Sequence, residues 1–358
     1  MITPEQRRYI EWHAYVPEHL PAYVTAITAA RPHLFGDYVA YAAGDRLIFV
    51  GYPLSGVYDE AAWLAALDAA TARLRPRLIA ITAAALPASL ADCPVSPPDA
   101  YYRLDLADVR PDKKLRNLLR RAERELAVHV GGRFGPEHRR LVAAFLARTP
   151  VDEGTRFIFE RVERYAGGKT GLEALAGLVC WARDRLKLRV GRETSPPGPA
   201  LQGEISLPGP VLRGETSPPG PLLLKGEGGE VPSPPSHAGN WGAGRPGAPL
   251  ILEARDAAGR LAAFDIATCA AGEFAFYLFN FRAPECYVPG ASDLLLARLI
   301  ELARAAGKRT LNLGLGINAG VRGFKEKWGA TPFLPHVACV RERPRAAWEE
   351  VVAGAVHE

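Results

Sequence analysis

One stretch of this sequence cannot build a hydrophobic core, and it divides the chain. Residues 191–247 contain three successive variants of one proline- and glycine-rich motif, GRETSPPGPALQ, GEISLPGPVLR and GETSPPGPLLLK. The motif has no three-residue glycine period, which excludes collagen, and it is too short for a solenoid turn. We therefore predict a disordered insertion; the alternative is a proline-motif ligand for a partner domain. The fold must be built by the residues on either side.

The chain as a whole has the composition of a globular protein. Its 358 residues are 48% hydrophobic and 23% charged, which suits two domains with sizeable cores. The five cysteines are scattered singly, so we expect no disulfide framework, no metal site and a reducing, cytoplasmic location. No signal pattern opens the sequence and no apolar run is long enough to span a bilayer. A net charge of +5 suits acidic ligands but is too modest to define them.

Hydrophobic periodicity predicts an α/β lobe in residues 1–110, in the order helix, hairpin, helix, strand, strand. A second unit is predicted at 111–190 and, after the insertion, at 248–345, with a tail at 346–358. Its later part is predicted to be a three-strand meander (250–282), a helix (293–306), a strand, a helix and a final strand near His336–Val340. The third strand of the meander is apolar on both faces, so we expect it to be central.

The clearest amphipathic helix covers residues 112–126. Leucines and Ala122 form its apolar stripe, and Asp112 can cap its start. Its other face carries six cations, Lys113, Lys114, Arg116, Arg120, Arg121 and Arg124. Several cations on one surface suit a polyanion such as RNA, whereas the absence of interleaved aromatic residues argues against base stacking. The alternative is an ordinary solvated helix face.

The run GASDLLLARLIELARAAGKRTLNLGLGINAGVRGFKEKWGATPF (290–333) carries a family resemblance. With the basic helix KLRNLLRRAERE (114–125), it resembles the C-terminal part of tandem-GNAT acyltransferases, including Fem-type aminoacyltransferases and the soluble domain of lysyl-phosphatidylglycerol synthase. The residues that carry the match most strongly are Gly320, Phe324, Lys325, Lys327, Trp328 and Gly329. The resemblance implies an α/β (α+β) fold of two GNAT-like lobes, each with a mixed, mostly antiparallel sheet flanked by helices.

The resemblance also implies a reaction. An acyl or aminoacyl group would move from acyl-CoA or aminoacyl-tRNA to an amine or hydroxyl acceptor by direct attack, without a bound cofactor. The acceptor would be a small molecule, a lipid headgroup or a peptide. The CoA-binding signature, Arg/Gln-x-x-Gly-x-Gly/Ala, is incomplete at the expected place (287–292), although Gly290 and Ala291 are small enough for backbone to approach a phosphate. Two alternatives stay open: an acetyl-CoA-dependent N-acetyltransferase, and a non-catalytic binding module that kept the fold.

Three residues are candidates for catalysis. The resemblance implies that Lys325 lies at the acyl-transfer centre, where a cation would stabilise the oxyanion; the alternative is a solvated lysine. Asp265 lies in mid-strand among small neighbours, as a general base or as a structural acid. Tyr277, on the next strand, is either a polar group in the cleft or a packed ring with a satisfied hydroxyl.

Six further residues are candidates for substrate binding. Arg322 would clamp a phosphate or pair with Glu326. Asn312 lies between leucines on a buried strand and needs backbone or ligand partners there. Asn280 is a second polar group in the cleft, and Asn318 is a helix cap that could also contact a ligand. Gly290 and Ala291 are small enough to let backbone approach a phosphate.

Overall fold

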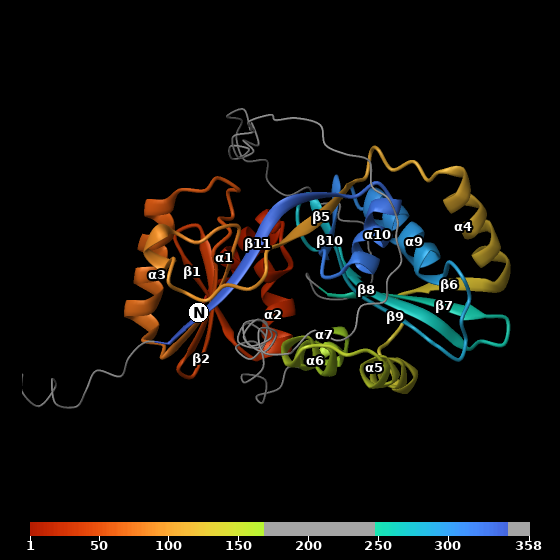
Figure 1. The fold of residues 1–358 in the computed structure, drawn as a ribbon, viewed down its shortest axis with the longest axis horizontal. Coiled ribbons are helices and arrows are strands. Elements are labelled where there is room, and N and C mark those ends of the chain that lie inside the picture. The colour runs from red at the N-terminus through yellow and green to blue at the C-terminus, as the bar shows by residue number, and fades with distance from the viewer. Residues whose placement is uncertain (168–247, 343–358) are drawn as a thin grey trace, which may run out of the picture.

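The computed structural model describes residues 1–167 and 248–342, and it has the mixed α/β fold that the sequence predicts (Figure 1). The predicted insertion, a helix predicted at 172–186 and the tail lie outside the described residues. The elements before residue 110 are α1 (Pro4–His13), a 3-10 helix η1 (Pro17–His19), α2 (Pro21–Thr28), β1 (Arg31–Phe35), β2 (Tyr38–Ala43), β3 (Arg46–Val50), α3 (Glu60–Leu74), β4 (Leu78–Ala83), η2 (Ala88–Leu90) and β5 (Asp99–Asp105).

The later elements follow the predicted order closely. They are α4 (Lys113–Glu125), β6 (Leu126–Val130), α5 (Pro136–Arg148), α6 (Glu153–Glu160), α7 (Val162–Ala166), β7 (Leu250–Asp256), β8 (Leu261–Thr268), β9 (Phe274–Arg282), α9 (Ala291–Ala305), β10 (Thr310–Leu315), α10 (Ala319–Lys327) and β11 (Thr331–Glu342). The meander of β7, β8 and β9 is antiparallel throughout, and β9 is an interior strand as its apolar faces predict.

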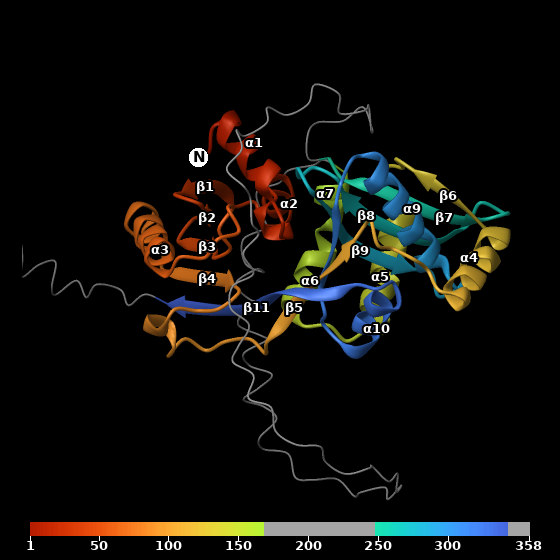
Figure 2. The ribbon, with the colours of Figure 1, turned by 90° about the horizontal axis from the view of Figure 1, so that it is seen from above.

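One long strand joins the two halves of the molecule. The described strands form a sheet in the order β1-β2-β3-β4-β11-β5-β10-β9-β8-β7-β6. Residues 331–336 of β11 pair with β5, and residues 337–342 of the same strand pair with β4. Figures 1 and 2 show β11 running across the middle of the molecule. The sequence predicts only its second half. Pro332 and Pro335 lack amide hydrogens, so the pattern of the first half is typical of a loop.

The first half of the sheet has helices on both faces. α3 covers one face, where Trp63 packs against Phe49 with 5.1 Å between ring centroids. α1 and α2 lie near the other face, whose core includes Ile10, Val24 and Tyr41. The hairpin of β2 and β3 turns at Gly44, which has a φ of +57°. α1 is absent from the sequence prediction because its residues are mostly polar, and it begins with a capping box at Thr3.

The second half of the sheet is also covered on both faces (Figure 1). α9 packs on β7, β8 and β9, and α4 packs on α9. On the opposite face, Phe279 and Phe281 of β9 meet the rings of Phe145 and Phe159 from α5 and α6. β5 lies in this half, between β11 and β10, although it falls within the predicted lobe 1–110. The proposed domain boundaries remain a prediction.

Candidate functional site

β9 and β10 separate shortly after they begin. They are parallel neighbours, but their pairing covers only Thr310–Asn312 on β10 and Phe274–Phe276 on β9, while β9 continues to Arg282. β10 is irregular beyond Asn312, where Gly314 takes a φ of +76°. β9 itself carries a bulge near Leu278, where its register with β8 shifts. The second half of β9 therefore presents backbone that β10 does not pair with, beside the helices that follow the two strands.

Lys325 of α10 lies where the two strands separate. Its side chain is buried, with 3% of its surface exposed. The Nζ atom donates hydrogen bonds to the carbonyl oxygens of Gly314 (2.9 Å) and Leu315 (2.5 Å), and it lies 5.5 Å from the ring centroid of Tyr102. Burial lowers the pKa of Lys325 to about 7, and the nearby Asp99 opposes part of that shift. Near neutral pH this amine can therefore both carry charge and exchange a proton.

Asp265 is fully buried on the face of β8 that looks toward α9. Its Oδ1 accepts hydrogen bonds from Nδ2 of Asn280 (2.6 Å) and from the Tyr277 hydroxyl (3.5 Å). Its Oδ2 has no hydrogen-bond partner within the described residues. Burial raises the pKa of this carboxyl well above its usual range, although the Asn280 and Tyr277 hydrogen bonds oppose the shift. An unpartnered buried oxygen of raised basicity is suited to proton transfer.

Tyr277 connects the acid with the helix that carries the lysine. Its hydroxyl donates to Asp265, and its ring stacks on that of Phe324, the residue before Lys325, with 6.4 Å between centroids. The bulge in β9 makes this possible, because it brings Tyr277 and Asn280 opposite Ala267 and Asp265 on one face. The three predicted catalytic residues thus lie in one region of the fold; their roles remain a proposal.

The hydrogen-bond chain reaches the start of α9. Ser292 donates from its Oγ to Oδ1 of Asn280 at 2.9 Å. The next residue, Asp293, is buried and accepts from Nε1 of Trp328 (2.9 Å), and it pairs with Nζ of Lys327 (2.6 Å). The motif residues Lys327 and Trp328 therefore attach α10 to α9. Sequence reasoning missed Ser292 and Asp293, since neither has a local signal beyond its place at a helix start.

α9 begins at Ala291, two residues before the predicted start at 293, and Gly290 is its N-cap. The small size of both residues has a structural cause. Gly290 caps the helix with a φ of +87°, a left-handed conformation that favours glycine. A Cβ there would lie 3.0 Å from Cγ of Leu118, so α4 packs directly on this turn. Ala291 is 3% exposed. The sequence predicts that a phosphate approaches this backbone closely, but in the structure α4 packs there.

The glycine turn before α10 is held by an acid from a distant part of the chain. Asp99 accepts the amides of Gly316 (3.0 Å) and Ile317 (2.9 Å) through its two carboxylate oxygens. Asn318 caps α10 by accepting the Val321 amide at 3.0 Å. These amides are therefore already paired. No sequence signal points to Asp99, because it reaches this turn across 217 positions.

Two other predicted binding residues have clear positions. Asn312 is fully buried and satisfied by backbone: its Nδ2 donates to the carbonyl of Tyr15 (2.8 Å), and its Oδ1 accepts the Gly314 amide (2.7 Å). Arg322 is exposed, unlike Lys325 three positions later. The three-residue spacing places Arg322 and Lys325 on neighbouring positions of one helix face, but α10 buries only the lysine.

The basic helix is confirmed as α4. Asp112 caps it by accepting the Leu115 amide at 2.6 Å, and Leu115 and Ala122 are buried. All six of its predicted nucleic-acid contacts are exposed, namely Lys113, Lys114, Arg116, Arg120, Arg121 and Arg124. Arg121 pairs with Glu125 at 3.3 Å. Among the described residues the two lysines, Arg120 and Arg124 make no ion pair, so most of this charge is available to a partner.

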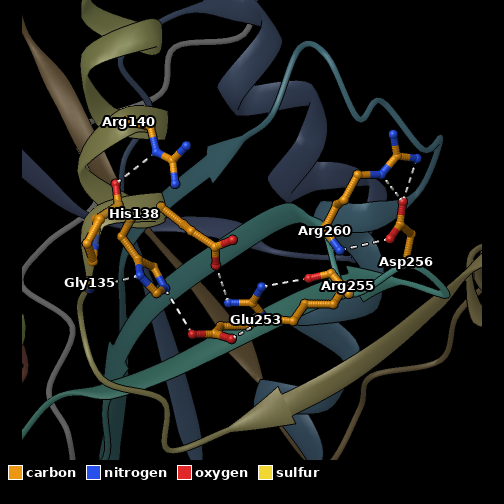
Figure 3. Close-up of polar contacts among 10 residues, drawn as sticks. Gly135, His138, Arg140, Glu253, Arg255, Asp256 and Arg260 are labelled. Atoms are coloured by element: carbon orange, nitrogen blue, oxygen red, sulfur yellow. Dashed lines mark hydrogen bonds and ion pairs between the residues drawn. The ribbon is translucent and has the colours of Figure 1, made fainter.

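A second buried polar network lies on the opposite face of the sheet (Figure 3). Nδ1 of His138 accepts the Gly135 amide (3.1 Å), which leaves the ring proton on Nε2, 3.0 Å from Oε1 of Glu253. Arg255 bonds both Glu253 (2.7 Å) and Glu137 (2.8 Å). Burial lowers the pKa of His138. Since every carboxylate here has a partner, the network attaches α5 to β7.

Two features are absent from the described part of the chain. Residues 1–167 and 248–342 contain no group of three or more histidine, cysteine or acidic side chains placed to hold a metal ion. None of their helices combines the length and the apolar character needed to cross a membrane.

The chain resembles several solved structures. L-PGS from Bacillus licheniformis shares 14% identity at a TM-score of 0.48, covering 98% of this chain and 96% of that one. FemX shares 11% at 0.46, covering 94% and 96%. A tandem GNAT protein from the clavulanic acid biosynthesis pathway shares 12% at 0.39, covering 86% and 79%. These proteins belong to the groups that the sequence motifs resemble, but the similarity is too low to transfer an activity or a residue's role. No family model and no curated protein matches the sequence.

Proposed function

We propose that this protein transfers an acyl or aminoacyl group from an activated ester or thioester to an amine or hydroxyl. The observation that carries the proposal is the separation of β9 and β10, with Lys325 buried where they part. Unpaired backbone on β9 can hold an extended donor as a further strand would. The buried amine places positive charge where the carbonyl oxygen becomes negative.

Each of the three central residues has a distinct part in this reaction. The nitrogen or oxygen of the acceptor attacks the donor carbonyl and forms the new bond, and the bond to the leaving sulfur or oxygen then breaks. Two N–H groups of the Lys325 ammonium donate to backbone carbonyl oxygens, and the third stabilises the intermediate oxyanion. The proton of the acceptor passes to the Tyr277–Asp265 pair, whose free Oδ2 can receive it.

The exposed charge on α4 supports an aminoacyl-tRNA donor over a small one. Five of its six cations have no ion-pair partner among the described residues, and they lie on the helix that packs against the start of α9. Cations on one surface bind phosphates with a strong salt dependence. We therefore propose that α4 positions tRNA while the region around Lys325 carries out transfer.

The test offers both donors in parallel. Acetyl-CoA is followed by release of its thiol, and a mixture of aminoacyl-tRNAs with labelled amino acids is followed by movement of label into acceptors. The acceptors are phosphatidylglycerol vesicles, a lysine-containing peptide and small amines. Lys325→Met should lower the transfer rate by about 10²–10³-fold, and Tyr277→Phe and Asp265→Asn by about 10²-fold or more.

The control is Arg73→Met, which removes an exposed cation from α3, in the first half of the molecule. It should change single-turnover transfer at saturating donor by less than about twofold. Consumption of acetyl-CoA alone would replace the tRNA proposal with an N-acetyltransferase. If neither donor is consumed above a protein-free blank, the protein is a binding module. If Lys325→Met, Tyr277→Phe and Asp265→Asn all leave transfer intact, the reaction takes place elsewhere.

A further inference from the structure

A cavity in the first half of the molecule lies apart from the residues discussed above. Its volume is about 70 Å³, and it is bounded by the sheet, by α2 and by Ile158 of α6. Its wall is mostly aliphatic, with Ile48 and Val50 from β3 and Ala80 from β4. β5 separates the cavity from Lys325, because Tyr101 faces the first core while its neighbour Tyr102 faces the lysine.

One carboxyl group lines this aliphatic cavity. Glu18, in η1, accepts a hydrogen bond at Oε2 from the Tyr101 hydroxyl at 2.8 Å. Within the described residues it makes no ion pair, and its neighbour His19 supplies no charge at neutral pH, since burial lowers the pKa of His19 to about 4. Burial raises the pKa of Glu18 itself. A carboxyl enclosed without a cation is costly to ionise, and a bound cation would remove that cost.

Aromatic rings complete the surroundings of Glu18. Burial, and then the Glu18 charge, raise the pKa of four tyrosines, Tyr23, Tyr41, Tyr52 and Tyr101. Tyr23 and Tyr41 line the cavity directly. The Tyr41 hydroxyl donates to the Glu18 carbonyl at 2.9 Å, whereas the Tyr23 hydroxyl has no hydrogen-bond partner among the described residues. Ring faces and a carboxylate together attract a cation with an apolar stem.

We propose that this cavity binds a primary amine at the end of a short aliphatic chain, as its ammonium ion, with Glu18 as the counter-ion. The ammonium donates to the Glu18 carboxylate and to the Tyr23 oxygen, and the methylene groups lie against Ile48, Val50 and Ala80. The volume limits the occupant, because a cavity of about 150 Å³ holds a benzene molecule. At the same filling about three non-hydrogen atoms fit here, which matches ethylammonium or the end of a longer aminoalkyl chain.

The experiment measures binding of ethylammonium chloride and of ethanol, its neutral counterpart, to the full chain at constant ionic strength. Ligand NMR relaxation gives the dissociation constants. The wild-type protein should bind the ammonium ion at least tenfold more tightly than the alcohol. Glu18→Gln should remove that preference and leave alcohol binding within about twofold. Ala80→Leu should abolish binding of both, because its added methyl groups fill the cavity.

Glu11→Gln is the matched control. Glu11 is a second buried glutamate whose pKa burial raises, and it pairs with Arg7 at 3.7 Å, outside the cavity wall. Its variant should keep the wild-type preference for the ammonium ion. The proposal is overturned if the wild type binds neither probe or binds both equally. It is also overturned if Glu18→Gln keeps the preference, or if a folded Ala80→Leu variant binds the ammonium ion normally. The site does not depend on the proposed transferase activity.

Discussion

Each half of the molecule places a carboxyl group beside tyrosine, but the two groups differ in burial and in what surrounds them. Asp265 in the second half is fully enclosed and fixed by Asn280 and Tyr277. Glu18 in the first half has one tyrosine bond and borders a cavity of about 70 Å³. Burial raises the pKa of both carboxyl groups, but their neighbours differ. A carboxyl group that is hydrogen-bonded to Tyr277 and Asn280 suits proton transfer, whereas a carboxyl group that borders a cavity suits binding of a cation.

The largest expected effect tests whether the two halves unfold together. Each half buries one tryptophan whose Nε1 is satisfied, Trp63 by the Gly51 carbonyl (3.2 Å) and Trp328 by Asp293 (2.9 Å). Trp63→Ala and Trp328→Ala should each lower the free energy of unfolding by about 3–5 kcal/mol. Because β11 pairs with both halves, we expect one urea transition in the wild type and in both variants. Two separate transitions would show that the halves are independent.

The next effect concerns Lys325 of the second half, whose buried amine has a lowered pKa. Its pKa in the folded state is about 7, below the usual value of 10.5, so the unfolded chain binds more protons between these limits. Stability should therefore rise with pH above 7, by about 2 kcal/mol between pH 7 and pH 9 from this group alone. Lys325→Met should lack that rise and Lys114→Met should keep it, as measured by urea unfolding at each pH. An equal slope in all three proteins would contradict the burial argument.

The two acids should show the opposite dependence on pH. Both have raised pKa values in the folded state, whereas they ionise near pH 4 in the unfolded chain. Their contribution to stability is thus complete below pH 4 and declines as pH rises toward the folded pKa. Relative to wild type, Asp265→Asn and Glu18→Gln should gain stability as pH rises from 4 to 7. Adding ethylammonium should reduce the gain for Glu18→Gln only, since it gives the wild-type carboxylate a cationic partner.

The smallest effect on stability is expected on α4. Arg120→Gln and Arg124→Gln replace exposed side chains without ion pairs in the described structure, so each should change the free energy of unfolding by less than about 0.5 kcal/mol. If α4 contacts tRNA, the double variant should reduce the slope of log affinity against log salt by roughly 2. Filter binding between roughly 50 and 200 mM salt measures the slope. An unchanged slope would remove α4 from the binding surface.

The sequence predicted the elements whose signals are local. The stripe of Leu115, Leu118 and Ala122 defines α4, and the apolar strand at 274–281 identifies β9 as central, since periodicity and hydrophobicity report burial directly. Prediction failed where partners are distant in sequence. The first half of β11 contains two prolines and becomes a strand only because β5 lies beside it. The acid that holds the turn before α10, Asp99, has no local signal at all.

The sequence by itself determined the order of most of the elements, the basic face of α4 and the types of residue near the proposed transfer site. These follow from composition and spacing along short stretches. Only the tertiary structure decided which of them are buried and what they contact. It buried Lys325 and exposed Arg322 on the same helix, gave Asn312 backbone partners, and left Glu18 beside a cavity. The physical reason is that burial and pairing set the energy of a charge, and both depend on segments that are distant along the chain.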